Sequence, residues 1–141
     1  MSEPLRQLIY ISTATCQMSE EDLTAILNKF RPRNGDNGIT GMLLFCEGHF
    51  MQVLEGPPDV IETLYTRICS DPRHTRHQVM FDHAIAAREF GEWQMAFHSV
   101  RVNELREQVG YLPWTEARGP NLEQDARHFI QYFHDMMSIR S

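Results

Sequence analysis

A tight β-hairpin over residues 36–56 is the feature of this sequence that most constrains its fold. The segment reads DNGITGMLLFCEGHFMQVLEG, and its two apolar runs, 39–46 and 49–55, are separated by Glu47-Gly48. A two-residue connection that ends in glycine, between runs rich in β-branched, leucine and phenylalanine residues, is typical of a short antiparallel turn. The sequence therefore predicts two neighbouring antiparallel strands here.

Gln52 is the unusual residue of the second predicted strand. Side chains alternate along a strand, so Gln52 shares one face with the large apolar residues Phe50 and Leu54. A buried amide needs partners, because each unpaired polar group costs roughly 1–3 kcal/mol. Two interpretations stay open at this point: the amide bonds to backbone or to a neighbouring side chain, as most buried glutamines do, or it contacts a ligand.

Further elements flank the hairpin on both sides. A helix is predicted to begin after an N-cap at Ser19 and to end before Pro32, since a residue that precedes proline is pushed out of the helical region. A second helix is predicted to begin in the turn 56–59 and to end near Asp71. The remaining predicted strands are 5–12, 77–85 and 93–100.

This order of elements predicts an α+β fold of the ferredoxin-like type, a βαββαββ sandwich. In that arrangement the first and third strands run side by side at the centre of the sheet, and both helices cover one sheet face. Tyr10 on the first strand and Gln52 on the third are then expected to be neighbours.

The pattern changes after residue 100. A polar helical stretch covers 103–110, and an amphipathic helix is predicted over 122–137, after a break at Pro113 and at Gly119-Pro120. We therefore expect a helical C-terminal extension over 101–141, added to a main domain over 1–100.

Composition and charge exclude several classes of protein. The chain has 141 residues and a formal charge of −6, and it has no basic stripe interleaved with aromatic residues, so we expect no nucleic-acid partner. It has no apolar run long enough for a membrane span and no signal peptide, so we expect a cytoplasmic protein without membrane contact. Its three cysteines are far apart, which favours reduced thiols over disulfides or a metal site.

Polar residues are predicted to gather between the two helices, above the central strands. An apolar cleft with a few convergent polar groups is what a ligand site needs. Arg67 and Asp71 lie four residues apart, so the carboxylate can orient the guanidinium, although a solvated surface ion pair is the favoured alternative without other support. His74 and His77 have no matching acidic or cysteine ligands, so no metal site is predicted. The residues expected in the cleft are Tyr10, Asn34, Thr40, Gln52, Arg67 and Asp71.

Several of these residues together resemble the BLUF family of blue-light sensors, which bind FAD. The resemblance is carried by the Tyr10 strand, Asn34, the ITG of 39–41, the run FMQVLEG around Gln52 and the run GEWQM around Trp93, colinear over about the first hundred residues. It implies a non-covalently bound flavin in a sensory domain over 1–100. FMN and riboflavin stay open beside FAD, because the adenine end has no recognisable motif.

The resemblance also implies a photochemical role for four residues. Tyr10 is implied as the donor of an electron and a proton to the excited flavin. Gln52 is implied to bond both Tyr10 and the flavin, and to rearrange its hydrogen bonds in the signalling state. Met95 and Trp93 match the strand that senses this change.

The remaining ligand residues follow from the same resemblance. Asn34 is implied to hold the flavin C4 carbonyl and N3–H, and Arg67, oriented by Asp71, is implied to reach the C2 carbonyl. Ile39 and Thr40, from the ITG motif, complete the implied cofactor-binding set.

The function predicted from all of this is a blue-light photoreceptor that is not an enzyme. Residues 101–141 are too few for a cyclase or a phosphodiesterase, so we expect the signal to pass to an unidentified downstream protein or through self-association, as a homo-oligomer. One alternative is a small hydrolase of the acylphosphatase type, which is disfavoured because the loop 13–18 contains no basic residue. The other is a colourless ligand-sensing dimer, which the colour of the purified protein distinguishes.

Overall fold

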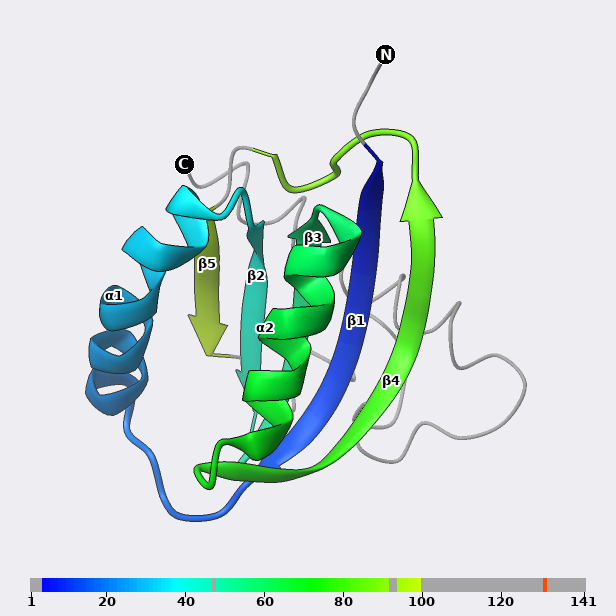
Figure 1. The fold of residues 1–141 in the computed structure, drawn as a ribbon. Helices are drawn as coiled ribbons and strands as arrows, with labels where there is room; N and C mark the ends of the chain where they lie inside the picture. Colours follow the sequence, from blue (N-terminus) through cyan, green and yellow to red (C-terminus); the bar gives the residue numbers. More distant parts are fainter. Residues whose placement is uncertain (1–3, 47, 92–93, 100–130, 132–141) are drawn as a thin grey trace.

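The computed structural model describes residues 4–46, 48–91, 94–99 and 131 (Figure 1). Within these residues the strands form a single sheet in the order β4-β1-β3-β2-β5. The elements are β1 (Leu5–Ala14), α1 (Glu20–Asp36), β2 (Thr40–Cys46), β3 (His49–Gly56), α2 (Pro58–Ser70), β4 (His74–Ile85) and β5 (Gln94–Ser99).

The predicted ferredoxin-like α+β arrangement is confirmed. β1 and β3 are antiparallel neighbours at the centre of the sheet, and Tyr10 lies directly opposite Gln52. β4 pairs antiparallel with β1, whereas β5 pairs parallel with β2 at the other edge. Both helices lie over the same face of the sheet (Figure 1).

The predicted hairpin joins β2 and β3, with Cys46 opposite His49. Two glycines make this pairing possible. Gly48 has φ +82°, a conformation that costs glycine little because it lacks Cβ. Gly41 has φ +155°, and a Cβ there would lie 1.9 Å from the carbonyl oxygen of Val53.

Helix α1 begins as predicted but ends later. The side chain of Ser19 caps the helix by accepting from the backbone N–H of Asp22, in a capping box. The expectation that the helix ends before Pro32 is wrong, since α1 continues to Asp36 with the proline inside it. The last turn is closed by the N–H groups of Asn37 and Ile39, which donate to the carbonyls of Arg33 and Asn34 at 3.1 and 2.8 Å.

β4 also begins earlier than the predicted residue 77. It starts at His74, which pairs with Ala14 at the end of β1. The register of β1 against β4 shifts near Arg76, whose φ is +57°. The irregularity interrupts the alternation of side chains between the two sheet faces. The sequence pattern therefore predicts only the part of β4 that follows it.

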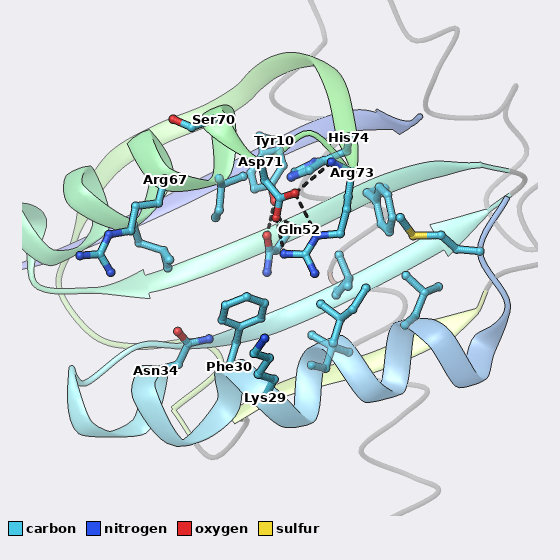
Figure 2. Close-up of a pocket in the computed structure, with 18 of the residues that line it drawn as sticks. Tyr10, Lys29, Phe30, Asn34, Gln52, Arg67, Ser70, Asp71, Arg73 and His74 are labelled. Atoms are coloured by element: carbon cyan, nitrogen blue, oxygen red, sulfur yellow. Dashed lines mark hydrogen bonds and ion pairs between the residues drawn. The ribbon is translucent and has the colours of Figure 1, made fainter. Parts of the chain in front are cut away.

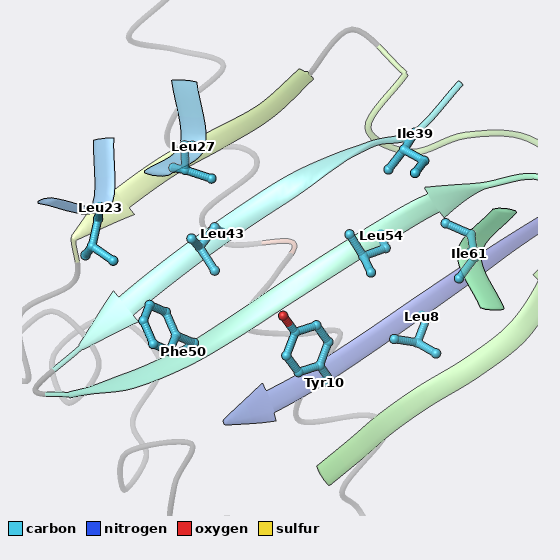
Figure 3. Close-up of a cluster of buried hydrophobic side chains, with 9 residues drawn as sticks. All are labelled: Leu8, Tyr10, Leu23, Leu27, Ile39, Leu43, Phe50, Leu54 and Ile61. Atoms are coloured by element: carbon cyan, nitrogen blue, oxygen red, sulfur yellow. The ribbon is translucent and has the colours of Figure 1, made fainter. Parts of the chain in front are cut away.

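Buried apolar side chains lie on both faces of the central strands. Between sheet and helices lies a core to which α1 contributes Leu23 and Leu27, and α2 contributes Ile61 (Figure 3). The sheet contributes Leu8, Tyr10, Ile39, Leu43, Phe50 and Leu54 to this core. On the opposite face, the fully buried apolar residues of these strands are Ile9, Met42, Leu44, Met51 and Val53.

Some predictions concern parts of the chain that the structure does not describe. The helical extension over 101–141 lies outside the described residues except for Gln131, which is helical. Trp93 and the side chain of Met95 also lie outside them. Among the described helices, none is both long and apolar enough to cross a bilayer.

Candidate functional site

A cavity of about 750 Å³ opens between α1, α2 and the sheet (Figure 2). Its floor is formed by the central strands, and its walls are largely apolar side chains of the two helices. The predicted site residues that line it are Tyr10, Asn34, Gln52, Arg67 and Asp71. They come from four different elements and the turn after α2, so the fold brings together residues that are far apart in the sequence.

Tyr10 and Gln52 meet at the floor of the cavity. They are cross-strand neighbours on β1 and β3, and the Tyr10 hydroxyl donates a hydrogen bond to Oε1 of Gln52. Tyr10 is only 2% exposed, and its burial raises the pKa of its phenol well above the usual range. The phenol is therefore protonated at physiological pH and acts as the donor to the amide.

Asn34 projects from the last turn of α1 toward the cavity (Figure 2). It is 8% exposed, and within the described part of the chain its side-chain amide has no hydrogen-bond partner. An unpaired buried amide costs roughly 1–3 kcal/mol. A ligand with both a donor and an acceptor on one edge would remove this cost.

The interpretation that Asp71 orients Arg67 is wrong, because Asp71 holds Arg73 instead. The Asp71 carboxylate accepts from the Arg73 guanidinium at 2.5 to 3.0 Å and from the Arg73 backbone N–H at 2.9 Å. The pairing lowers the pKa of Asp71 and raises that of Arg73. Helix α2 ends at Ser70 and Asp71 is extended, so a four-residue helical spacing no longer joins Asp71 to Arg67.

Arg73 is a site residue that the sequence reasoning missed. Its guanidinium carbon lies 5.5 Å from the ring centroid of Phe30 on α1, so Arg73 spans the cavity from the α2–β4 turn to the opposite wall. Helical periodicity cannot reveal such a residue, because it follows the helix. The available signal is the short Asp-x-Arg spacing directly after a predicted helix end.

Two predicted ligand residues do not line the cavity. Ile39 is 2% exposed and packs in the core beside it. Thr40 pairs with Glu55, so it lies on the sheet face away from Gln52, where its hydroxyl accepts from Arg88 at 2.9 Å. The ITG motif therefore shapes the strand and does not supply cavity contacts.

A cluster of aromatic and imidazole rings surrounds Tyr10 on its other side. The ring centroids of Tyr65 and His77 lie 5.3 and 5.8 Å from that of Tyr10. Nδ1 of His74 is 2.8 Å from the Ser12 hydroxyl and 3.1 Å from Nε2 of His77. Burial lowers the pKa of His74 to about 4 and also lowers that of His77, so both imidazoles are neutral at pH 7.

This chain is similar to proteins that respond to light. The family model described as "Sensors of blue-light using FAD" matches residues 5–96. The chain is 52% identical over 71 residues to photoactivated adenylate cyclase subunit beta of Euglena gracilis, covering 50% of this chain and 8% of that protein. It is 39% identical over 85 residues to the blue light- and temperature-regulated antirepressor BluF of Escherichia coli (strain K12), covering 60% of this chain and 20% of that protein.

Solved structures agree with these matches over most of the chain. The dark-state structure of the BLUF protein BlrB has a TM-score of 0.75 and 31% sequence identity, and the match covers 94% of this chain and 99% of that one. The photo-activated state of BlsA has a TM-score of 0.77 and 25% identity, with 92% and 94% covered. The chain thus belongs to the BLUF family, the sensors of blue light that use FAD.

Proposed function

We propose that Tyr10 and Gln52 form the photochemical centre of this blue-light sensor, and that the cavity above them holds the flavin. The observation that carries the proposal is the hydrogen bond from the buried Tyr10 hydroxyl to Gln52, at the floor of the cavity. A cavity of about 750 Å³ has the size of sites for small molecules and cofactors.

The groups around the cavity fit the polar edge of an isoalloxazine ring. Asn34 offers both a donor and an acceptor, which suits the neighbouring C4 carbonyl and N3–H. Arg73 presents a cation whose direction is fixed by Asp71, which suits the C2 carbonyl. Arg67 lines the same cavity and is the second candidate for that carbonyl.

Light-driven chemistry then depends on the phenol and the amide. When bound, the flavin absorbs blue light and becomes a strong oxidant. Tyr10 would donate an electron to the excited flavin, and its O–H proton would follow through the Gln52 amide that accepts its hydrogen bond, so that the transferred charge is balanced. The two ends of the amide differ, one accepting and one donating, so a rearranged Gln52 offers the opposite pattern to its neighbours. In a dry site such an exchange is energetically larger than in water.

An absorption spectrum before and after illumination tests the proposal. The purified chain with FAD should show a reversible shift of the flavin bands to longer wavelength under blue light. Tyr10→Phe and Gln52→Leu should abolish the shift and keep the flavin bound. Tyr65→Phe is the matched control, because it removes a neighbouring hydroxyl whose ring lies 5.3 Å from that of Tyr10. A normal photocycle in Tyr10→Phe would mean that the photochemical residues are wrongly assigned.

The output of the sensor is a separate part of the proposal. BLUF domains are sensors and not catalysts, and the relatives named above are a cyclase subunit and an antirepressor. We propose that residues 1–100 sense light in the cytoplasm and that 101–141 form a helical extension without enzymatic activity. The signal then passes to a partner protein or changes the association of a homo-oligomer. Size-exclusion chromatography with light scattering gives the molar mass of the protein in darkness and under blue light, and thereby tests self-association directly.

A further inference from the structure

Glu55 is a buried carboxylate that the flavin site does not use. It follows Gln52 by three residues on β3, so its side chain lies on the opposite face of the sheet, and it is 0% exposed. Three N–H groups donate to it: the Gln7 side-chain amide at 2.7 Å, and the backbone of Glu89 and of Phe90 at 3.0 and 2.8 Å. Its position is therefore fixed by groups from β1 and from the β4–β5 connection.

Arg88 ties the same connection to the hairpin. Its guanidinium donates to the backbone carbonyl of Glu55 at 3.2 Å, to that of Gly38 at 2.7 Å and to the Thr40 hydroxyl at 2.9 Å. Together with the two backbone bonds to the Glu55 carboxylate, the residues 88–90 make five hydrogen bonds: three to β3, one to the start of β2 and one to Gly38 in the turn before β2. We refer to Glu55 and Arg88 with these bonds as the latch.

The latch connects the strand that carries Gln52 with the chain that enters β5. Residues 88–90 lie between the end of β4 at Ile85 and the start of β5 at Gln94. Phe90 is 1% exposed and anchors the connection in the core, whereas Arg88 is half-buried and Glu89 is exposed. A displacement of β3 at Glu55 would lengthen these bonds or move the groups that donate them, because charge-assisted bonds to a carboxylate are short and strong.

Resting on the proposed function of Gln52, we propose that Glu55 and Arg88 are positioning residues that carry its rearrangement along β3 to the segment 88–90 and into β5. Neither residue touches the cavity. The latch would convert a change in one side chain into a change in the backbone of a neighbouring segment, through the hydrogen bonds that the segment 88–90 makes to β3.

Glu55→Gln is the sharpest perturbation of the latch. The glutamine has nearly the same size, but one of its two ends is an NH₂ donor. Both carboxylate oxygens of Glu55 accept from N–H groups, so the variant leaves at least one N–H facing another donor. Asp82→Asn is the matched control, because that carboxylate accepts two bonds from Arg6, at 2.6 and 2.7 Å, between β4 and β1.

The test uses the full chain with FAD bound, in darkness and under blue light. We measure the flavin red shift, the rate of dark recovery and the hydrogen exchange of the amides of 94–99. In the parent protein the exchange of these amides should differ between darkness and light. Glu55→Gln should keep the red shift but lose the light-dependent difference. Its recovery should be faster by about tenfold, which corresponds to about 1.4 kcal/mol in the barrier, because Gln52 relaxes without moving the segment 88–90.

The outcomes separate this inference from the proposed function. A normal red shift in both proteins, with unchanged recovery and exchange in Glu55→Gln, overturns the latch alone. A parent protein that binds FAD without any red shift overturns the proposed function, and the latch with it. If Glu55→Gln does not fold, Arg88→Lys decides by the same two readouts, since it keeps the charge and loses the forked donors. Asp82→Asn should leave recovery and exchange as in the parent, and equal effects in this control would contradict the latch.

Discussion

Replacing Asn34 by leucine should change the stability of the flavin-free protein and its affinity for flavin in opposite directions. Without flavin, the Asn34 amide is buried at 8% exposure and is unpaired among the described residues. Water in the cavity can satisfy part of this amide, so removing the amide recovers the lower end of the penalty for an unpaired group, about 1 kcal/mol. Leucine is also the better helix former by a few tenths of a kcal/mol, and the cavity of about 750 Å³ leaves room for its larger side chain. We expect the flavin-free variant to be more stable by about 1 kcal/mol.

With flavin, the sign reverses. Leucine can neither donate to nor accept from the ring edge, so buried polar atoms of the flavin are left without partners. Each such loss costs roughly 1–3 kcal/mol, and the affinity for flavin should therefore fall by about 5- to 150-fold. A residue that only supports the fold would change stability and affinity in the same direction, so the opposite signs identify a ligand contact.

Chemical denaturation of the flavin-free protein gives the stability, and titration followed by the quenching of flavin fluorescence gives the affinity. Asn28→Leu is the control, because Asn28 is an exposed asparagine on the same helix that accepts from Arg31 at 2.7 Å. It should change stability by less than about 0.5 kcal/mol and leave the affinity unchanged. The reasoning is refuted if flavin-free Asn34→Leu is less stable than the parent, or if its affinity for flavin matches that of the parent.

Three further predictions concern the frame of the site. Pro32→Ala should stabilise the protein by about 2 kcal/mol in thermal denaturation, because it restores an N–H donor to the carbonyl of Asn28 inside α1; no gain would mean that the helix ends before Pro32. Gly41→Ala should prevent soluble expression, because its Cβ would lie 1.9 Å from the Val53 carbonyl oxygen, and a folded variant would contradict the β2–β3 register. Burial lowers the pKa of His74 from 6.5 to about 4, so between these pH values the unfolded chain binds more protons than the folded chain, and stability falls as the pH falls. His74→Gln should reduce this loss of stability between pH 6.5 and 4 in urea denaturation. An unchanged pH profile of the variant would contradict the prediction.

The fold was predictable where the information is local. The glycine turn of the hairpin, the alternation around Gln52 and the N-cap at Ser19 each depend on a few consecutive residues, and the structure agrees with all of them. The end of α1 was not predictable in this way. Pro32 disfavours the helix locally by about 3 kcal/mol. The continuing turn is closed by backbone bonds from Asn37 and Ile39, which lie beyond the helix, to the carbonyls of Arg33 and Asn34.

The site shows the same division between local and long-range information. Tyr10 and Gln52 could be expected to meet, because strand order and side-chain period together determine which residues face each other across β1 and β3. Asp71 could be expected at the cavity, but its partner could not. The partner depends on the backbone conformation of Asp71, the first residue after α2. Because Asp71 is extended, its carboxylate binds Arg73 and not Arg67.

Strand β3 carries polar side chains on both faces of the sheet. This arrangement explains why a signal would leave the cavity through β3. A close-packed apolar core resists small displacements, whereas a hydrogen-bonded group can change partners at modest cost. The buried apolar residues Met51, Val53 and Leu54 hold β3 between two packed layers. Two of its polar residues, Gln52 on the cavity face and Glu55 on the other, are the points at which the strand can exchange one bonding pattern for another. We therefore expect a change in the hydrogen bonds of Gln52 to be transmitted by the rigid strand to those of Glu55, without any rearrangement of the core.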